Sequence, residues 1–221
     1  MVQVRAQLTR QALTMAAAKS FSLNGYERTT LTEVSGAADV SKGALSFHFS
    51  SKEDLAETVL REACSRTLQA TRTLLEKRQP ALRALMDLTH WVAHQLASDP
   101  LTQAAVRLVR ELKTPSDPEV NLLDCWRSIF TEVAEKAEEE GTLRPGTTAE
   151  GVAELAFCIV ASGAHSQQAG TEDADGSDVH HRLSGLWQML LHGVVSNSGS
   201  SHSAGTGLDR RPTSNEPALA S

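Results

Sequence analysis

The sequence predicts an all-α protein, made of an N-terminal three-helix bundle and a larger C-terminal helical core. Apolar residues recur at helical spacing along most of the 221-residue chain, and no segment shows the alternating pattern of a strand. Proline, glycine and short polar clusters divide this pattern into separate helices. Residues 31–50 contain two very short helical segments joined by a tight turn, which is the anatomy of a helix-turn-helix.

The first helix is expected over residues 3–24. Leu8, Met15 and Phe21 recur there near helical spacing, so one face is predicted to pack against the rest of the bundle. Asn24-Gly25 follows as a helix stop. Packing is the main role expected of this helix.

The turn between the two short helices is expected at Asp39. Its short polar side chain tolerates the left-handed backbone conformation better than most non-glycine residues do. Val40 is predicted to fill the angle between the helices, and Ser41 to cap the second of them. Lys42, Gly43 and Ala44 begin that helix with small or flexible side chains, so its N-terminal end can approach another surface. In a helix-turn-helix this end enters the major groove of DNA.

Direct readout of DNA is expected from the start of the second helix, where Lys42 is the best candidate for a base edge or a phosphate. Its polar neighbours with shorter reach are Ser41, Ser46 and His48. His48 is equally well explained as a partly packed residue at the helix end. Phe47 and Phe49 are predicted to be core anchors, because a helix in duplex DNA needs no exposed aromatic platform. Arg5 and Arg10 are expected to reach phosphates from the first helix.

The C-terminal core is predicted to begin with a long helix capped by Ser51 and ending near Lys77, roughly 38 Å in length. Such a helix would link the bundle to a distant site. Proline- and glycine-bearing turns separate the further helices expected over residues 81–97, 101–113, 119–140, 149–169 and 180–195. The resulting domains are 1–51, 52–196 and a tail, 197–221, whose composition predicts disorder.

The net charge of −6 is unevenly divided. Residues 1–51 carry +2 and the remaining 170 residues carry −8, which fits a protein that touches DNA with one end only. The sequence contains no run of about 18 apolar residues and no secretory signal pattern, so we expect a cytoplasmic protein. Its three widely spaced cysteines argue against a disulfide framework.

Several motifs resemble those of the TetR family of transcriptional repressors. They are Thr29-Thr30-Leu31, Val40-Ser41-Lys42-Gly43-Ala44-Leu45, His48-Phe49 and Lys52-Glu53-Asp54-Leu55. The run from Lys42 to Phe49 is most similar to the γ-butyrolactone receptor branch of antibiotic-producing actinobacteria. The match is dense over about residues 5–60 and looser beyond them. The family usually has Gly at the position of Asp39, and at the position of Ser46 a phosphate-contacting Tyr.

The resemblance implies a repressor that binds an operator as a dimer and is released by a small signalling molecule of γ-butyrolactone, butenolide or furan type. In this branch such a repressor is expected to control antibiotic production. The alternative is a drug- or metabolite-sensing repressor of an efflux or biosynthetic gene. A DNA binder that senses no ligand is a further rival. The residues expected to bind DNA are Thr30, Ser41, Lys42, Gly43, Ser46, His48 and Lys52.

Ligand-binding residues are expected in the core. In the resembled branch a tryptophan in the segment of Trp126 stacks on the lactone ring; without the resemblance, an indole filling the core would be favoured. Cys64 stands where related receptors carry Gln. The further polar candidates are Thr89, Gln95 and Ser162. Trp187 is assigned to packing in a terminal apolar helix, and the last two helices are expected to form the dimer surface.

An enzyme or a metal protein is not predicted. His90 and His94 are spaced to face one metal ion on a helix, but no cysteine or carboxylate completes a recognisable ligand pattern. No nucleophile elbow or phosphate-binding loop organises the serines and cysteines into a catalytic set. We therefore expect no cofactor.

Overall fold

The computed structural model describes residues 2–112, 121–166 and 177–194, and these residues form helices joined by short loops. Three helices make up the head: α1 (Val2–Arg28), α2 (Leu31–Ala37) and α3 (Lys42–His48). The core contains α4 (Lys52–Glu76), α5 (Ala81–Ser98), α6 (Pro100–Glu111), α7 (Leu122–Glu139), α8 (Ala149–Ser166) and α9 (Ser177–Val194). The predicted all-α architecture is confirmed.

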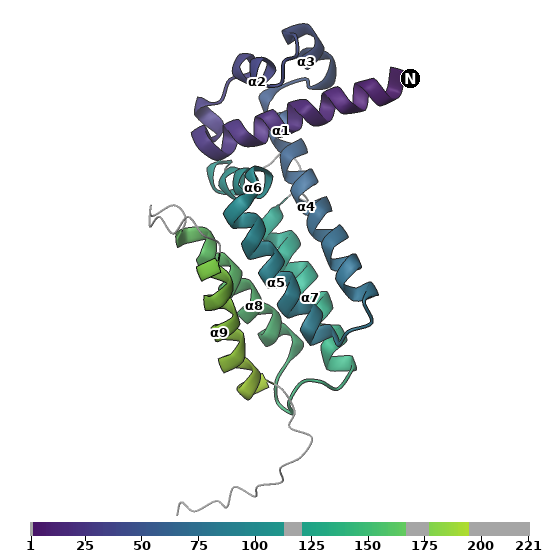
Figure 1. Ribbon diagram of the computed structural model, residues 1–221, viewed down its shortest axis with the longest axis vertical. Helices are drawn as coiled ribbons and strands as arrows, with labels where there is room; N and C mark the ends of the chain where they lie inside the picture. Colours follow the sequence, from purple (N-terminus) through teal and green to yellow (C-terminus); the bar gives the residue numbers. More distant parts are fainter. Residues whose placement is uncertain (1, 113–120, 167–176, 195–221) are drawn as a thin grey trace, which may run out of the picture.

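The head lies at one end of an elongated molecule (Figure 1). α1 crosses this end, and α4 descends from it along one side of the core. Beneath the head, α6 packs against α1, while α5 packs against α7, α8 and α9. The head thus rests on α4 and α6, the core helices against which α1 packs.

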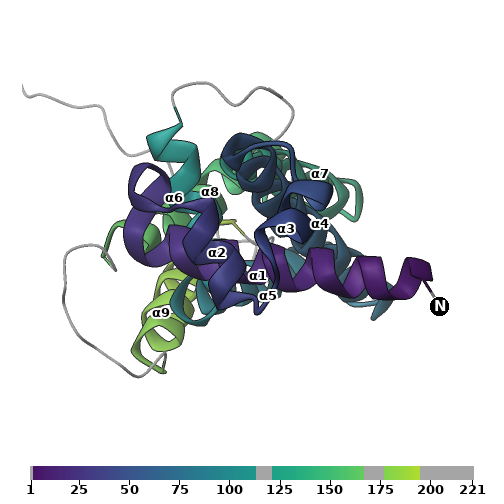
Figure 2. The same cartoon turned by 90° about the horizontal axis from the view of Figure 1, so that it is seen from above.

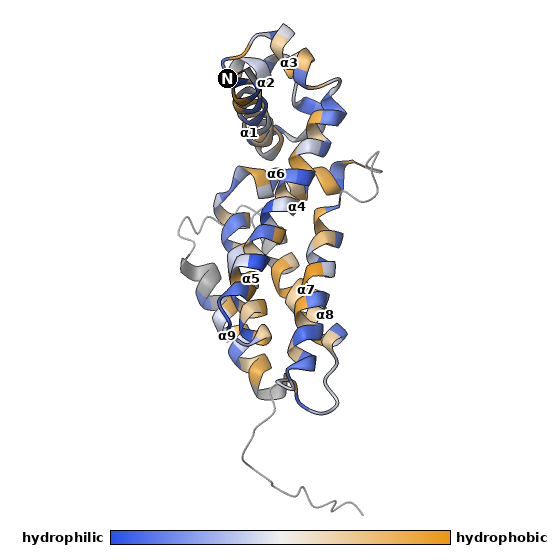
Figure 3. Cartoon of the chain, turned by 90° about the vertical axis from the view of Figure 1, so that its right-hand side faces the viewer, coloured by the Kyte–Doolittle hydropathy of each residue, from blue (hydrophilic) through white to orange (hydrophobic). Residues whose placement is uncertain are grey.

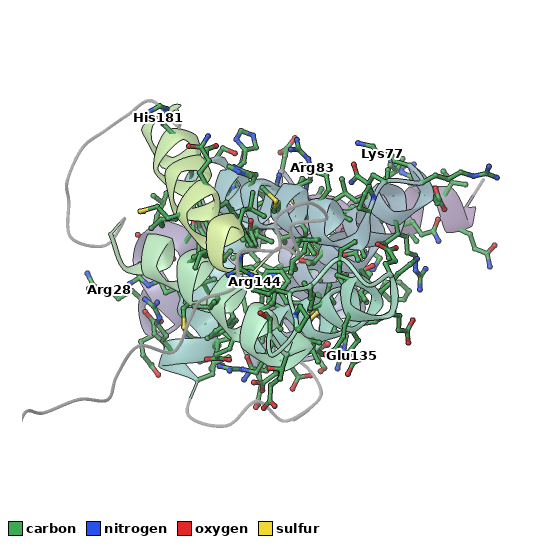
Figure 4. All side chains as sticks on the ribbon, turned by 90° about the horizontal axis from the view of Figure 1, so that it is seen from below. Arg28, Lys77, Arg83, Glu135, Arg144 and His181 are labelled. Atoms are coloured by element: carbon green, nitrogen blue, oxygen red, sulfur yellow. The ribbon has the colours of Figure 1, made fainter. Side chains whose placement is uncertain are left out.

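The core helices are amphipathic, with hydrophilic and hydrophobic turns alternating along them (Figure 3). Their inner faces bury large side chains almost completely, among them Leu85, Leu88, Trp126 and Phe130. Each such side chain contributes about 1.5–3 kcal/mol on transfer from water, so burial is the main source of stability. Seen from below, Lys77, Arg83, Glu135 and His181 lie at the rim (Figure 4).

Helix ends follow the polar residues that cap them. α6 begins at Pro100 because Asp99 accepts a hydrogen bond from the Thr102 N–H (3.1 Å). α7 begins at Leu122, where Asn121 is the cap. Past its end, Gly141 adopts φ 69°, and the Thr142 N–H reaches back to the Ala137 carbonyl (3.2 Å). This closing turn is a Schellman motif, which needs a left-handed residue.

The predicted helix boundaries agree with the structure to within a few residues. The helix expected over 119–140 starts at Leu122, and the one expected over 180–195 starts earlier, at Ser177. The expected stop at Gly25 is a kink (φ 80°, ψ 176°), after which α1 continues to Arg28. Residues 119–120, 167–169 and 195–221, including the tail predicted to be disordered, lie outside the described part of the chain. None of the helices in the described part is long and apolar enough to cross a bilayer.

Candidate DNA interface and ligand pocket

The turn of the helix-turn-helix is closed by backbone hydrogen bonds around Asp39. The Asp39 N–H donates to the Gly36 carbonyl (3.1 Å), and the Val40 N–H donates to the Ser35 carbonyl (2.9 Å). Together they form a Schellman motif in which Asp39 is the left-handed residue, with φ 52°. The left-handed conformation expected of Asp39 is therefore confirmed. The backbone of Asp39 thus adopts a conformation that glycine adopts most readily, at a modest strain.

Thr30 is the N-cap of α2. Its hydroxyl accepts from the Glu33 N–H (3.2 Å), and the Glu33 carboxylate accepts from the Thr30 N–H (3.0 Å). This reciprocal capping box fixes the start of α2, although Thr30 itself stays exposed. The Thr-x-x-Glu spacing of Thr30 and Glu33 is the sequence signal for a capping box, and the sequence analysis did not use it.

α3 has one buried face and one exposed face. Leu45 and Phe49, four residues apart, are each only 2% exposed. Ser41 caps the helix by accepting from the Ala44 N–H (3.2 Å), as expected. The exposed face contains Lys42, Gly43, Ser46 and Phe47. Figure 2, which views the molecule from above, shows α2 and α3 lying across the end of the head.

The prediction that Phe47 is a core anchor is wrong. Its side chain is 82% exposed, while Phe49 is buried as expected. Residues two apart on a helix point to different faces, so Phe47 and Phe49 could not both be anchors. Phe47 contacts only the edge of the His48 ring, at 5.2 Å between centroids, among its aromatic contacts in the described residues. Phe47 is therefore a candidate interface residue, and the i, i+4 pairing of Leu45 with Phe49 was the signal that identifies it.

Arg10 is engaged inside the head. Its guanidinium donates to the His48 carbonyl (2.7 Å) and to the Thr58 hydroxyl (3.1 Å), and lies 4.4 Å from the Phe49 ring centroid. These contacts cap the C-terminal end of α3 and tie α1 to α4. Arg10 thus holds the reading helix in place, whereas the expectation was a phosphate contact.

Lys52 is also engaged internally. Its ammonium donates to the Tyr26 carbonyl (2.9 Å) and lies 4.3 Å from the centre of the Tyr26 ring. Lys42, by contrast, is exposed and forms no ion pair within the described residues. Among the basic candidates of the helix-turn-helix, Lys42 is the one positioned to meet a phosphate or a guanine.

The junction between the head and the core is a charged clamp around Gly25. Arg107 of α6 donates to the carbonyls of Ser22 and Leu23 (3.0 Å each) and to the Glu111 carboxylate (2.6 Å). Glu111 in turn accepts from the Tyr26 N–H (2.6 Å). We call this set the Arg107–Glu111 clamp.

Desolvation opposes the charge on Glu111, but the hydrogen bonds from Arg107 and the Tyr26 N–H outweigh it. The pKa of this carboxyl consequently lies below its ordinary value of 4.5. The clamp therefore favours an ionised Glu111, and it joins a kink in α1 to the last turn of α6.

The structure does not bring all the expected ligand residues together. Trp126 is 1% exposed, and its indole N–H donates to the Thr67 hydroxyl of α4 (3.2 Å). Cys64 lies one turn before Thr67 on α4, and it is partly buried against the core. The structure thus brings Trp126 and Cys64 to the same contact between α4 and α7.

Thr89 lies elsewhere, between α5 and α9. It is fully buried and receives a hydrogen bond from the Trp187 indole (2.8 Å), so its hydroxyl is occupied by a packing contact. Trp187 is packed, as assigned. Gln95 is half-buried on α5, and Ser162 belongs to α8, where its side chain lies outside the described part of the structure. Among the described residues, no three His, Cys, Asp or Glu side chains are grouped as metal ligands.

The described residues define a helix-turn-helix protein, with a capped reading helix exposed at one end and a helical core behind it. The model of bacterial regulatory proteins of the tetR family matches residues 13–59. The chain belongs to the TetR family.

Its relatives point to one branch of that family. The A-factor receptor protein of Streptomyces griseus is 28% identical over 193 residues, which cover 87% of this chain and 66% of that protein. The crystal structure of a γ-butyrolactone receptor, an ArpA-like protein, is 30% identical with a TM-score of 0.69, covering 87% of this chain and 90% of that one. CprB of Streptomyces coelicolor, solved in complex with its operator, is 30% identical with a TM-score of 0.67 and the same coverage.

Proposed function

We propose that this protein is a transcriptional repressor that binds an operator as a dimer and leaves it when a small signalling molecule enters the core. The observation that carries the DNA-binding part is the exposed face of α3, which presents Lys42, Gly43 and Ser46 beyond a buried Leu45–Phe49 face. A helix presented in this way fits the major groove. Relatives that are receptors for A-factor and for γ-butyrolactone support a ligand of γ-butyrolactone, butenolide or furan type.

The proposed interface with DNA consists of Thr30, Ser41, Lys42, Gly43, Ser46, Phe47 and His48. Lys42 supplies the charge. Gly43 has no side chain and faces open space, so the backbone of α3 can approach DNA closely there. Lys52 acts indirectly, because its ammonium holds the end of α1. We place this activity in the cytoplasm and assign the chain a regulatory rather than an enzymatic role.

The proposed dimer surface lies on α8 and α9. Three large apolar side chains on these helices stay exposed in the single chain: Leu155 (42%), Leu186 (39%) and Met189 (68%). Covering them with a second copy would remove apolar surface from water. Met189→Asp is expected to yield monomers in sedimentation velocity. Leu68→Asp on α4, where Leu68 is 41% exposed, serves as the control and should remain dimeric.

The proposed ligand site is the contact between α4 and α7 at Trp126. Because α4 joins the core to the head, a ligand that separates α4 from α7 shifts the population toward a different head spacing. Two such heads in a dimer would then no longer match half-sites about 34 Å, or a multiple of it, apart. Repression is lost by this change in spacing.

Release from DNA tests the proposal. An operator is selected from a pool of random duplexes, and the complex is titrated with γ-butyrolactones, butenolides, furans and antibiotics. Release by one of the first three classes is expected, and release only by antibiotics favours the sensing of drugs or metabolites. Binding without sequence preference and without release by any compound would contradict the proposal.

Trp126→Phe locates the pocket. Trp187→Phe is a matched control, since both indoles are 1% exposed and both donate to a threonine hydroxyl. Trp126→Phe is expected to raise the ligand concentration for half-release about tenfold, on the order of one ring contact and one hydrogen bond. Trp187→Phe should leave that concentration unchanged. Equal effects of both variants on this ligand concentration would show that the ligand does not bind at Trp126.

A further inference from the structure

Phe47 is the large apolar side chain that remains on the exposed face of α3. Its ring is 82% exposed, whereas Leu45 and Phe49, two residues to either side, are buried in the head. Its neighbours on the exposed face are polar or small, and one of them is the basic Lys42. Covering the ring with DNA would remove apolar surface from water, provided that the group it meets is also apolar.

Phe47 lies one helical turn after Gly43, so the two residues share a stripe along α3. A Cβ added at Gly43 would meet nothing within 4 Å, which means that the chain leaves open space on this stripe. A base edge that approaches the backbone of α3 at Gly43 therefore meets the Phe47 ring one turn further along the helix.

The end of α3 that carries Phe47 is braced within the head. The Phe47 and His48 rings meet edge to face with 5.2 Å between their centroids, and the His48 carbonyl accepts from the Arg10 guanidinium (2.7 Å). The same guanidinium lies 4.4 Å from the centroid of the buried Phe49 ring. Because these contacts fix the helix end before DNA arrives, ordering Phe47 on binding costs little conformational entropy.

We propose that Phe47 determines specificity by contacting the 5-methyl group of a thymine in the major groove. This role rests on the proposed function, in which α3 enters that groove. Of the four bases, thymine alone presents a methyl group there, while the other base edges present hydrogen-bonding groups. A phenyl ring pairs with none of those groups, so it favours thymine by contact and disfavours the other bases by leaving polar atoms unpaired. Lys42 supplies charge, and Phe47 selects a base.

Replacing thymine by uracil tests the contact, because uracil lacks only the 5-methyl group. The operator selected for the full chain is synthesised with uracil in place of each thymine of one half-site in turn, and binding is measured by fluorescence anisotropy. At one position under α3, uracil should weaken wild-type binding about fourfold, as expected for one methyl group that is no longer removed from water.

Variants of Phe47 assign this effect to its ring. Phe47→Ala should bind the thymine and uracil operators equally well at that position, and Phe47→Leu, which keeps an apolar side chain, should retain at least a twofold preference for thymine. Leu68→Ala, which removes an exposed apolar side chain of α4, should keep the full wild-type preference. Because Phe47 is exposed, both of its variants should unfold at the wild-type denaturant concentration, so a change in binding is not a loss of fold.

Two results would overturn this role of Phe47. One is wild-type binding that is equally tight with uracil at every thymine position. The other is a Phe47→Ala protein that keeps the wild-type penalty for uracil, because another residue would then contact the methyl group. Both results leave the proposed function standing, since sequence-specific binding and release by a ligand are measured on the unsubstituted operator. If no operator can be selected, the proposed function fails and the role of Phe47 fails with it.

Discussion

The exposed face of α3 and the Arg107–Glu111 clamp are both polar, yet they are built in opposite ways. In the clamp, the Arg107 guanidinium and the Glu111 carboxylate are bonded to each other and to the backbone of α1. On α3, the Lys42 ammonium has no ion pair among the described residues. Arg107 and Glu111, which hold the head on the core, thus find their partners within the chain. The Lys42 ammonium on α3 remains available to DNA.

Two glycines allow the same substitution to be made in each region. In the clamp, a Cβ on Gly25 would lie 2.6 Å from Arg107 Nη2 and 2.7 Å from Glu111 Oε1. The backbone there (φ 80°, ψ 176°) is also one that only glycine adopts readily. Gly25→Ala is expected to lower the free energy of unfolding by about 3 kcal/mol, through strain and broken hydrogen bonds. Chemical denaturation measures this loss, and a change below about 0.5 kcal/mol would contradict the account of the clamp.

Arg10→Ala removes an arginine used internally. It breaks the contacts of Arg10 with the His48 carbonyl, the Thr58 hydroxyl and the Phe49 ring, and should cost about 2 kcal/mol of stability. Arg5→Ala, at the exposed start of α1, is the matched control and should leave the stability within about 0.5 kcal/mol. If both variants unfold at the wild-type denaturant concentration, Arg10 does not hold α3.

Gly43→Ala is the same change, glycine to alanine, on the exposed face of α3. The added methyl meets nothing in the chain, and alanine favours a helix, so stability should stay the same or rise by up to about 1 kcal/mol. Operator affinity should nevertheless fall about tenfold, on the order of 1.4 kcal/mol, because the methyl stands where the helix approaches DNA. Fluorescence anisotropy and denaturation of the same sample separate the two effects. A loss of stability without a loss of operator affinity would show that Gly43 packs within the chain and does not face DNA.

The smallest expected effect is a pH dependence of the clamp. The pKa of Glu111 is depressed in the folded protein, so its contribution to stability is complete above the ordinary value of 4.5 and is lost as the pH falls through the folded value. Glu111→Gln should therefore lower the unfolding midpoint at pH 7 and lower it less at the acidic end. Thermal scans of both proteins over this range give the comparison, and a difference independent of pH would show that the charge of Glu111 is not involved.

Local signals in the sequence predict the head well. Asp39 at a left-handed position and Ser41 as an N-cap depend on the chemistry of single residues, and both were predictable. The capping box of Thr30 with Glu33 followed the same local logic and was missed. Phe47 was misplaced because the helical spacing of Leu45 and Phe49 was not applied to it.

Contacts between distant segments were beyond the reach of sequence reasoning. Arg10 meets Thr58 and His48 across more than 35 residues, and Arg107 meets the backbone of α1 across more than 80. A basic side chain looks the same in the sequence whether it faces DNA or a carbonyl. The hydrogen bond of Trp126 with Thr67 likewise depends on how α4 packs on α7.

Operator binding by Lys42→Ala over a series of salt concentrations tests the central claim most directly. The control is Lys136→Ala, an exposed lysine on α7 far from the head in the sequence. The account predicts that Lys42→Ala weakens operator binding about tenfold and reduces the salt slope by about one, while Lys136→Ala matches the wild-type protein. Unchanged affinity and slope for Lys42→Ala would show that α3 is not the helix that contacts DNA.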